Sequence, residues 1–124
     1  MMEKIGVVKI MIKVNFNYNS EKGCLKLRIL GHASYAPRGE DLVCAAVSAL
    51  AITAGETAKM LWEQGFLKRP PLVMLHDGNA LVIVNPEEPC LEAAAMAFWT
   101  IQTGIFALEQ RYPGFVQLEG VLRM

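Results

Sequence analysis

Four residues with acid, base or nucleophilic side chains lie close together in this sequence: His32, Asp41, Cys44 and Ser48. Cys44 is the central candidate. A thiol in the first turn of a helix faces unsatisfied backbone N–H groups and the positive end of the helix dipole, and both favour the thiolate. Because the thiolate is the nucleophilic form of cysteine, one hypothesis for this segment is a cysteine-dependent reaction.

The other three residues could complete such a site. The segment between His32 and Cys44 is long enough to fold back and place the imidazole beside the sulfur, which would form a Cys–His pair. Asp41 is three positions before Cys44 and shares a helix face with it, so Asp41 would cap the helix or hold His32 in position. Ser48 could donate a hydrogen bond into the same site or bond to a backbone carbonyl.

Structural interpretations of the same residues remain open on spacing alone. A cysteine such as Cys44 in an Ala-rich helix is more often a small buried apolar residue than a nucleophile. The histidine at the end of a strand could be a solvated or hydrogen-bonded structural residue, and we expect His76, beside a turn, to be exposed. The spacing of Cys24, Cys90 and the histidines matches no zinc motif, so we expect no metal ion and no other cofactor.

The hydrophobic pattern predicts the elements that position these residues. Apolar residues alternate over 10–16 and again over 25–29, which predicts a first hairpin. The segment 31–40 lacks a period and predicts a loop, after which Asp41 would be the N-cap of a helix ending near Gly65. Two short apolar runs around Asp77-Gly78 predict a second hairpin, and a helix from Leu91 to about Arg111 follows.

The resulting order is β-β-α-β-β-α with a possible short final strand at 115–121. It predicts an α+β fold of two layers, in which helices pack on a mostly antiparallel sheet. No linker interrupts the pattern, so residues 1–124 are interpreted as a single domain.

Composition narrows the function classes. The chain has 124 residues, 53% of them hydrophobic, and its 12 basic and 12 acidic residues leave no net charge. This balance disfavours a disordered chain and argues against direct nucleic-acid binding through bulk charge. The longest apolar runs, 42–54 and 93–101, are shorter than the roughly 20 residues needed to cross a bilayer, so we expect no membrane segment. An odd cysteine count and a first segment unlike a signal peptide predict a cytoplasmic protein.

The first helix is apolar on two sides, and a small domain this apolar has more hydrophobic side chains than one core can hide. Both features point toward a partner surface or a homo-oligomer.

The stretch 31–50, GHASYAPRGEDLVCAAVSAL, resembles the signature of the bacterial ribosomal-processing cysteine protease family, called Prp. The matched elements are G-H-A, G-x-D and D-[IL]-V-C-A-A-V-S-A-L. The resemblance implies a small cytoplasmic cysteine endopeptidase that removes the N-terminal extension of ribosomal protein L27 during ribosome maturation. It also implies a homodimer.

Carried over to this chain, the resemblance makes Cys44 the nucleophile and His32 the general base that later protonates the leaving amine. Asp41 and Ser48 would support the site. The family's mobile substrate loop corresponds here to residues 33–40, with Gly39 as a possible hinge. The loop residues singled out are Ala33, Ser34, Tyr35 and Gly39.

Two other functions stay open at this point. One is a non-catalytic ribosome-assembly module that binds a peptide without cutting it, which would keep binding after Cys44→Ser and release no shortened product. The other is a thiol hydrolase that acts on a small thioester.

Overall fold

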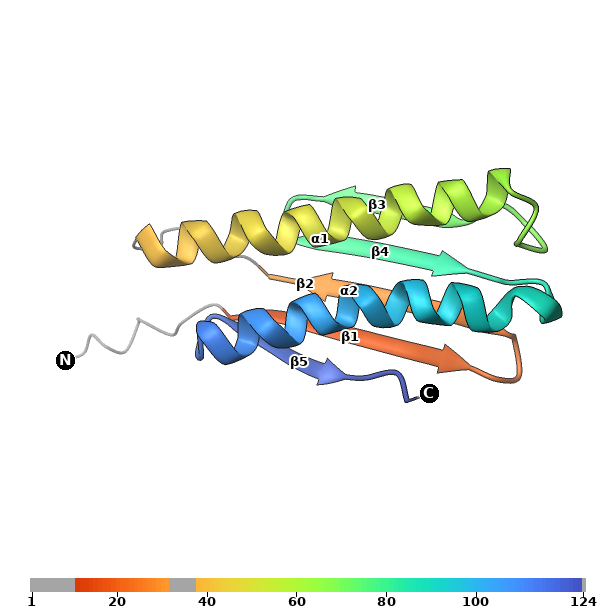
Figure 1. Ribbon diagram of the computed structural model, residues 1–124. Helices are drawn as coiled ribbons and strands as arrows, with labels where there is room; N and C mark the ends of the chain where they lie inside the picture. Colours follow the sequence, from red (N-terminus) through yellow and green to blue (C-terminus); the bar gives the residue numbers. More distant parts are fainter. Residues whose placement is uncertain (1–10, 32–37, 124) are drawn as a thin grey trace.

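A computed structural model describes residues 11–31 and 38–123 of the chain. For residues 38–41 it describes the backbone alone. Its single sheet has the strand order β3-β4-β2-β1-β5. Two helices lie side by side on one face of this sheet (Figure 1). The strands are β1 (Ile12–Asn19), β2 (Cys24–Leu30), β3 (Leu72–His76), β4 (Asn79–Val84) and β5 (Val116–Gly120), and the helices are α1 (Arg38–Glu63), α2 (Leu91–Arg111) and the 3₁₀ turn η2 (Glu88–Cys90). The predicted two-layer α+β fold and its element order are confirmed.

Both predicted hairpins are present. In β1, Ile12, Val14 and Phe16 are buried and alternate with exposed polar residues, as the period of two requires. The second hairpin has a two-residue turn, and its Gly78 has a φ of 76°, which an L side chain rarely adopts. Antiparallel pairing of β2 with β4 joins the hairpins into one sheet.

The last strand is also formed. β5 pairs with β1, and this pairing is parallel, whereas β1–β2, β2–β4 and β3–β4 are antiparallel. Beyond the strand, the buried Gln102 of α2 binds both backbone groups of Leu122: its Nε2 donates to the carbonyl at 3.3 Å and its Oε1 accepts from the N–H at 2.6 Å. The C-terminal segment is thus part of the fold, held by the sheet and by α2.

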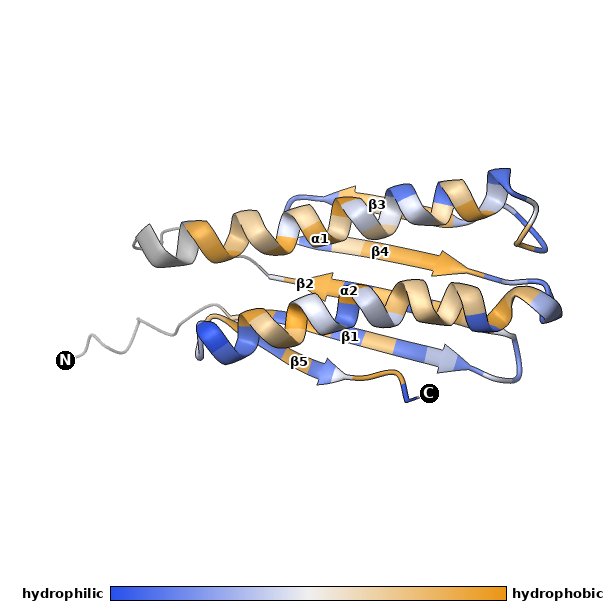
Figure 2. Ribbon diagram, viewed as in Figure 1, coloured by the Kyte–Doolittle hydropathy of each residue, from blue (hydrophilic) through white to orange (hydrophobic). Residues whose placement is uncertain are grey.

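The two helices divide the sheet between them. α1 packs on β3 and β4, and α2 packs on β1, β2 and β5. Apolar residues are concentrated in β4 and in the first half of α1 (Figure 2). On the side of α1 that faces the sheet, Val43, Val47 and Ala54 are buried.

The start of α1 differs from the prediction. The helix begins at Arg38, so Asp41 lies in its first turn and is not its N-cap, and Gly39 and Glu40 are helical rather than part of a loop. The first turn is polar, so it carries no hydrophobic period that could have indicated a helix.

The helices extend beyond the apolar runs 42–54 and 93–101, from whose length no membrane segment was predicted. Residues Leu42–Glu63 and Glu88–Arg111 are long and apolar enough to span a bilayer by length and composition alone. Both helices pack on the sheet and contribute buried residues to its core. Core helices of globular domains can be as long and as apolar as membrane-spanning helices. In each of these segments, only 33% of the most apolar 18-residue stretch is buried, so much apolar surface remains on the helix layer.

The Gln102–Leu122 pairing gives a stability prediction. Gln102→Leu would leave a buried N–H and a buried carbonyl of Leu122 without partners, so the free energy of unfolding should fall by about 1–3 kcal/mol in urea denaturation. The same substitution at the exposed Gln110 of α2 is the matched control and should change it by less than about 0.5 kcal/mol. Equal effects at both positions would show that the pairing contributes nothing.

Candidate active site

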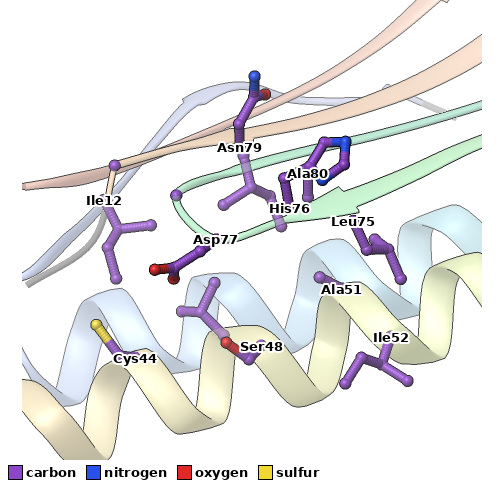
Figure 3. A pocket seen from close by; sticks show the side chains of 14 residues that line it. Ile12, Cys44, Ser48, Ala51, Ile52, Leu75, His76, Asp77, Asn79 and Ala80 are labelled. Atoms are coloured by element: carbon purple, nitrogen blue, oxygen red, sulfur yellow. The ribbon is translucent and has the colours of Figure 1, made fainter.

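A pocket of about 510 Å³ lies between α1 and the sheet, at the edge where β2 ends and β3 turns into β4 (Figure 3). α1 contributes Cys44 and Ser48 to its lining, the end of β2 contributes Gly31, and the β3–β4 turn contributes Asp77. Three segments that are far apart in the sequence therefore meet at one concave site, the usual form of a small-molecule or peptide site.

Cys44 is half-buried in the lining of this pocket, as expected for a candidate nucleophile that must be reached by a substrate. The other two cysteines lie elsewhere: Cys24 begins β2, at the opposite end of that strand from Gly31, and Cys90 precedes α2. The Cys24 sulfur lies 3.6 Å from the Lys22 carbonyl and accepts from the Asn85 amide at 3.5 Å, contacts of a structural thiol. Among the described residues, Cys44 is the cysteine that lines the pocket.

The position of Cys44 within its helix was predicted incorrectly. Because α1 begins at Arg38, Cys44 lies in the second turn, about 9 Å along the axis from the first helical residue. The effect of a helix dipole falls off within the first turn, so the helix terminus contributes little to a thiolate at Cys44.

Gly31 fixes how the chain leaves β2 beside the pocket. Its N–H donates to the Gly78 carbonyl at 2.9 Å, and its φ is 94°. A Cβ at this position would lie 2.8 Å from the Met11 carbonyl oxygen, so both conformation and space require glycine. The next residue in the chain is His32, which is outside the described residues, as are the predicted loop residues Ala33, Ser34 and Tyr35.

Asp77 is a pocket residue that the sequence did not identify. Its carboxylate projects from the β3–β4 turn toward the face of α1 that carries Cys44 and Ser48 (Figure 3). Its neighbour His76 is exposed as predicted, and its ring points away from α1. Asp77 had been assigned only to the turn, and 33 residues separate it from Cys44, so no local pattern could connect the two.

Ser48 lies one helical turn after Cys44 and is exposed to the pocket. Other hydroxyl residues of the helices, such as Thr53 and Thr100, donate to the carbonyl four positions earlier. Within the described part of the chain the Ser48 hydroxyl makes no such bond, which leaves its donor for a group in the pocket. The side chain of Asp41 is not described, so its supporting role stays a prediction.

A half-buried cysteine that lines a pocket of a two-layer α+β domain is a candidate for the nucleophile of a cysteine-dependent hydrolase, and comparison with known proteins gives the family. The family model described as cysteine protease Prp matches residues 11–117. The ribosomal processing cysteine protease Prp of Bacillus subtilis (strain 168) is 34% identical over 99 residues, which cover 80% of this chain and 85% of that protein. The chain belongs to the cysteine protease Prp family and is a cysteine protease.

Solved structures agree with the fold. The crystal structure of the essential ribosomal processing protease Prp from S. aureus, in complex with a substrate peptide, superimposes with a TM-score of 0.64 at 20% identity, covering 90% of this chain and 100% of that one. SMU.848 from Streptococcus mutans has a TM-score of 0.64 at 26% identity, covering 91% and 96%. Membership in a protease family disfavours the non-catalytic binding module considered from the sequence.

The charge of Asp77 gives a prediction about Cys44. Two unit charges several ångströms apart in water interact by roughly 0.6 kcal/mol, a factor of about three in rate. A cationic methanethiosulfonate should therefore modify Cys44 faster than an anionic one, and Asp77→Asn should lower that rate ratio by roughly threefold to tenfold. Rates are read by peptide mass spectrometry, with Cys24 and Cys90 as controls in the same molecule. An unchanged rate ratio at Cys44 would show that the charge of Asp77 does not act on reactions of this thiol.

Proposed function

We propose that this protein removes the N-terminal extension of ribosomal protein L27 during ribosome maturation, with Cys44 as nucleophile and His32 as general base. The observation that carries the proposal is the position of Cys44: it lines a pocket between α1 and one end of the sheet, in a chain of the cysteine protease Prp family. The B. subtilis relative is a ribosomal processing protease, and the S. aureus relative binds a substrate peptide.

The reaction follows from these two residue types. His32 takes the proton of the Cys44 thiol, and the sulfur forms a bond to the scissile carbonyl carbon. The C–N bond then breaks, the amine leaves with the proton returned by the imidazole, and the peptide's N-terminal part remains as a thioester on Cys44. Water, deprotonated by His32, attacks the thioester and releases the carboxylate and the thiol.

Two features support His32 as the base. The chain reaches the pocket at Gly31, one residue before His32, and the bond from Gly31 to Gly78 holds this end of β2 against the β3–β4 turn. The second feature is the residue type: an imidazole can accept the proton of a thiol, and the imidazolium that forms stabilises a thiolate beside it.

The remaining site residues are given supporting roles. We assign Ser48 as a hydrogen-bond donor into the pocket and Asp41 as a positioning residue. Residues 33–37, the part of the predicted substrate loop that precedes α1, are assigned as the segment that admits the substrate, and Gly39 lies in the first turn of that helix. The protein is proposed to act in the cytoplasm, where it meets ribosomal protein through the L27 peptide and not through RNA or membrane.

The proposal predicts that Cys44→Ala and His32→Ala each reduce cleavage of an L27 precursor by at least a thousandfold, because one removes the nucleophile and the other its base. Cleavage is measured by mass spectrometry of the products, and circular dichroism should show unchanged folding. Cys24→Ala and Cys90→Ala are matched controls, expected to retain activity. Cleavage by Cys44→Ala would overturn the assignment.

We also propose that the protein is a homodimer that uses the outer face of its helix layer. Met60 of α1 is 60% exposed and Met96 of α2 is 49% exposed, both on surface that the sheet does not cover. A second copy would bury this apolar area, as homodimer interfaces do.

The dimer proposal predicts that light scattering gives a dimer mass for the wild type and a monomer mass for the Met60→Glu/Met96→Glu variant, because buried unpaired charges oppose association. Lys59→Glu, at an exposed position of α1, lowers the net charge by the same two units and controls for a change of charge alone. A wild-type monomer at all concentrations would contradict the dimer, and an unchanged mass for the methionine variant would contradict this face.

A further inference from the structure

Asp77 gives the pocket a negative charge. Its carboxylate projects from the β3–β4 turn toward the face of α1 that carries Cys44 and Ser48 (Figure 3). Among the described residues that line the pocket, Asp77 is the one carboxylate, and no lysine or arginine is present. His76 also belongs to this lining, but its ring points away from α1. The described part of the lining thus presents an acidic group that no cation faces.

The charge of Asp77 is not neutralised elsewhere in the described part of the chain. The ion pairs formed there are Lys13–Glu119 at 3.9 Å and Lys59–Glu56 at 3.3 Å, and none of these residues lines the pocket. The Asp77 carboxylate also accepts no hydrogen bond from a described residue. Because the side chain is exposed as well, both of its oxygens are available to a ligand.

Backbone contacts hold Asp77 in place. The carbonyl of Gly78, the next residue, accepts from the Gly31 N–H at 2.9 Å, and His76 pairs with Asn79 across the turn. The position of Asp77 is therefore fixed by the main chain on both sides, and its carboxylate takes no part in holding the turn. A charged group that is positioned in advance loses little conformational entropy when it binds a ligand.

The chemistry of the nucleophile favours a cationic ligand at this carboxylate. When Cys44 is a thiolate, the pocket holds a second negative charge. Like charges repel each other, and a cationic group of a bound substrate offsets both of them. Hydrogen bonds between a carboxylate and an ammonium or guanidinium group are also stronger than those between neutral groups.

We propose that Asp77 is a specificity residue that binds a positively charged group of the peptide substrate close to the scissile bond. The inference rests on the proposed protease activity and adds the charge that the site prefers. Two groups offer this chemistry. One is a lysine or arginine side chain of the substrate, and the other is the amino group released on the leaving peptide, which is protonated at neutral pH.

The test for a side chain uses the full-length protein and synthetic peptides that span the L27 cleavage site. Each position near the scissile bond carries lysine, glutamine or glutamate in turn, and kcat/KM is measured for each peptide. At one position the wild type should prefer lysine to glutamine by about threefold to tenfold and cleave the glutamate peptide most slowly. Salt of about 1 M, where the Debye length is about 3 Å, should abolish this preference.

The test for the released amino group is product inhibition. The C-terminal product peptide with a free N-terminus should inhibit the wild type about threefold to tenfold more strongly than the same peptide with an acetylated N-terminus. A preference in this assay alone identifies the released amino group, and a preference among the substrate peptides alone identifies the side chain.

Asp77→Asn should reduce whichever preference is found to less than about twofold. Asparagine has nearly the same shape as aspartate and is as common in tight turns, so this variant removes the charge and keeps the fold. Glu92→Gln, at an exposed position of α2, is the matched control and should keep the preference of the wild type. No charge preference in either assay, or the same preference in Asp77→Asn, would overturn the proposal.

Two further outcomes separate this inference from the proposed function. If Asp77→Asn lowers kcat/KM equally for lysine, glutamine and glutamate peptides, Asp77 acts on the protein's own catalytic groups and the inference is wrong. Protection of Cys44 from iodoacetamide by each peptide measures binding without cleavage and should follow the same order of charge. Charge-dependent protection in a wild type that cleaves none of the peptides would overturn the proposed function and support the cation site.

Discussion

The backbone hydrogen bond from the Gly31 N–H to the Gly78 carbonyl joins the end of β2 to the β3–β4 turn, and the pocket depends on this joint. It holds Asp77 and the strand end before His32 on one side of the pocket, while α1 presents Cys44 on the other. The joint requires glycine at both positions, because Gly31 and Gly78 each have a positive φ and a side chain on Gly31 would meet the Met11 carbonyl. Two short segments thus set the geometry of a site built from three elements.

The same arrangement explains where the apolar residues of this chain are used. Both helices cover one face of the sheet, and each buries only one side against it. Apolar side chains therefore remain exposed in two places: Ile52 and Leu75 line the pocket, and Met60 and Met96 lie on the outer face of the helix layer. A sequence that is 53% hydrophobic and without net charge is consistent with these two exposed apolar surfaces.

Much of the fold was predictable because it is encoded locally. Alternation over β1 and β2 and the Asp77-Gly78 turn identified the hairpins. The start of α1 was placed too late, because its first turn is polar and Asp41 is an equally good residue type for an N-cap and for a first turn. The parallel pairing of β5 with β1 could not be derived, because strand partners are chosen by tertiary packing.

The site was predictable only in part, for the same reason. Cys44 and Ser48 share a local spacing that places both on one helix face, and both line the pocket. Asp77 and Leu75 come from a distant hairpin, and only the crossing of α1 over β3 brings them to Cys44. A turn residue such as Asp77 carries the same sequence signal whether or not it lies beside a nucleophile.

The central claim is that Cys44 forms a covalent intermediate with the peptide, and trapping that intermediate tests it most directly. The wild-type protein is mixed with a peptide spanning the L27 cleavage site, quenched in acid within the first turnover, and mapped by mass spectrometry. The account predicts a mass increase equal to the N-terminal product, carried as a thioester on Cys44, with Cys24 and Cys90 unmodified. An adduct on another residue would contradict this account. Product formation by a protein that carries Cys44→Ala would contradict it as well.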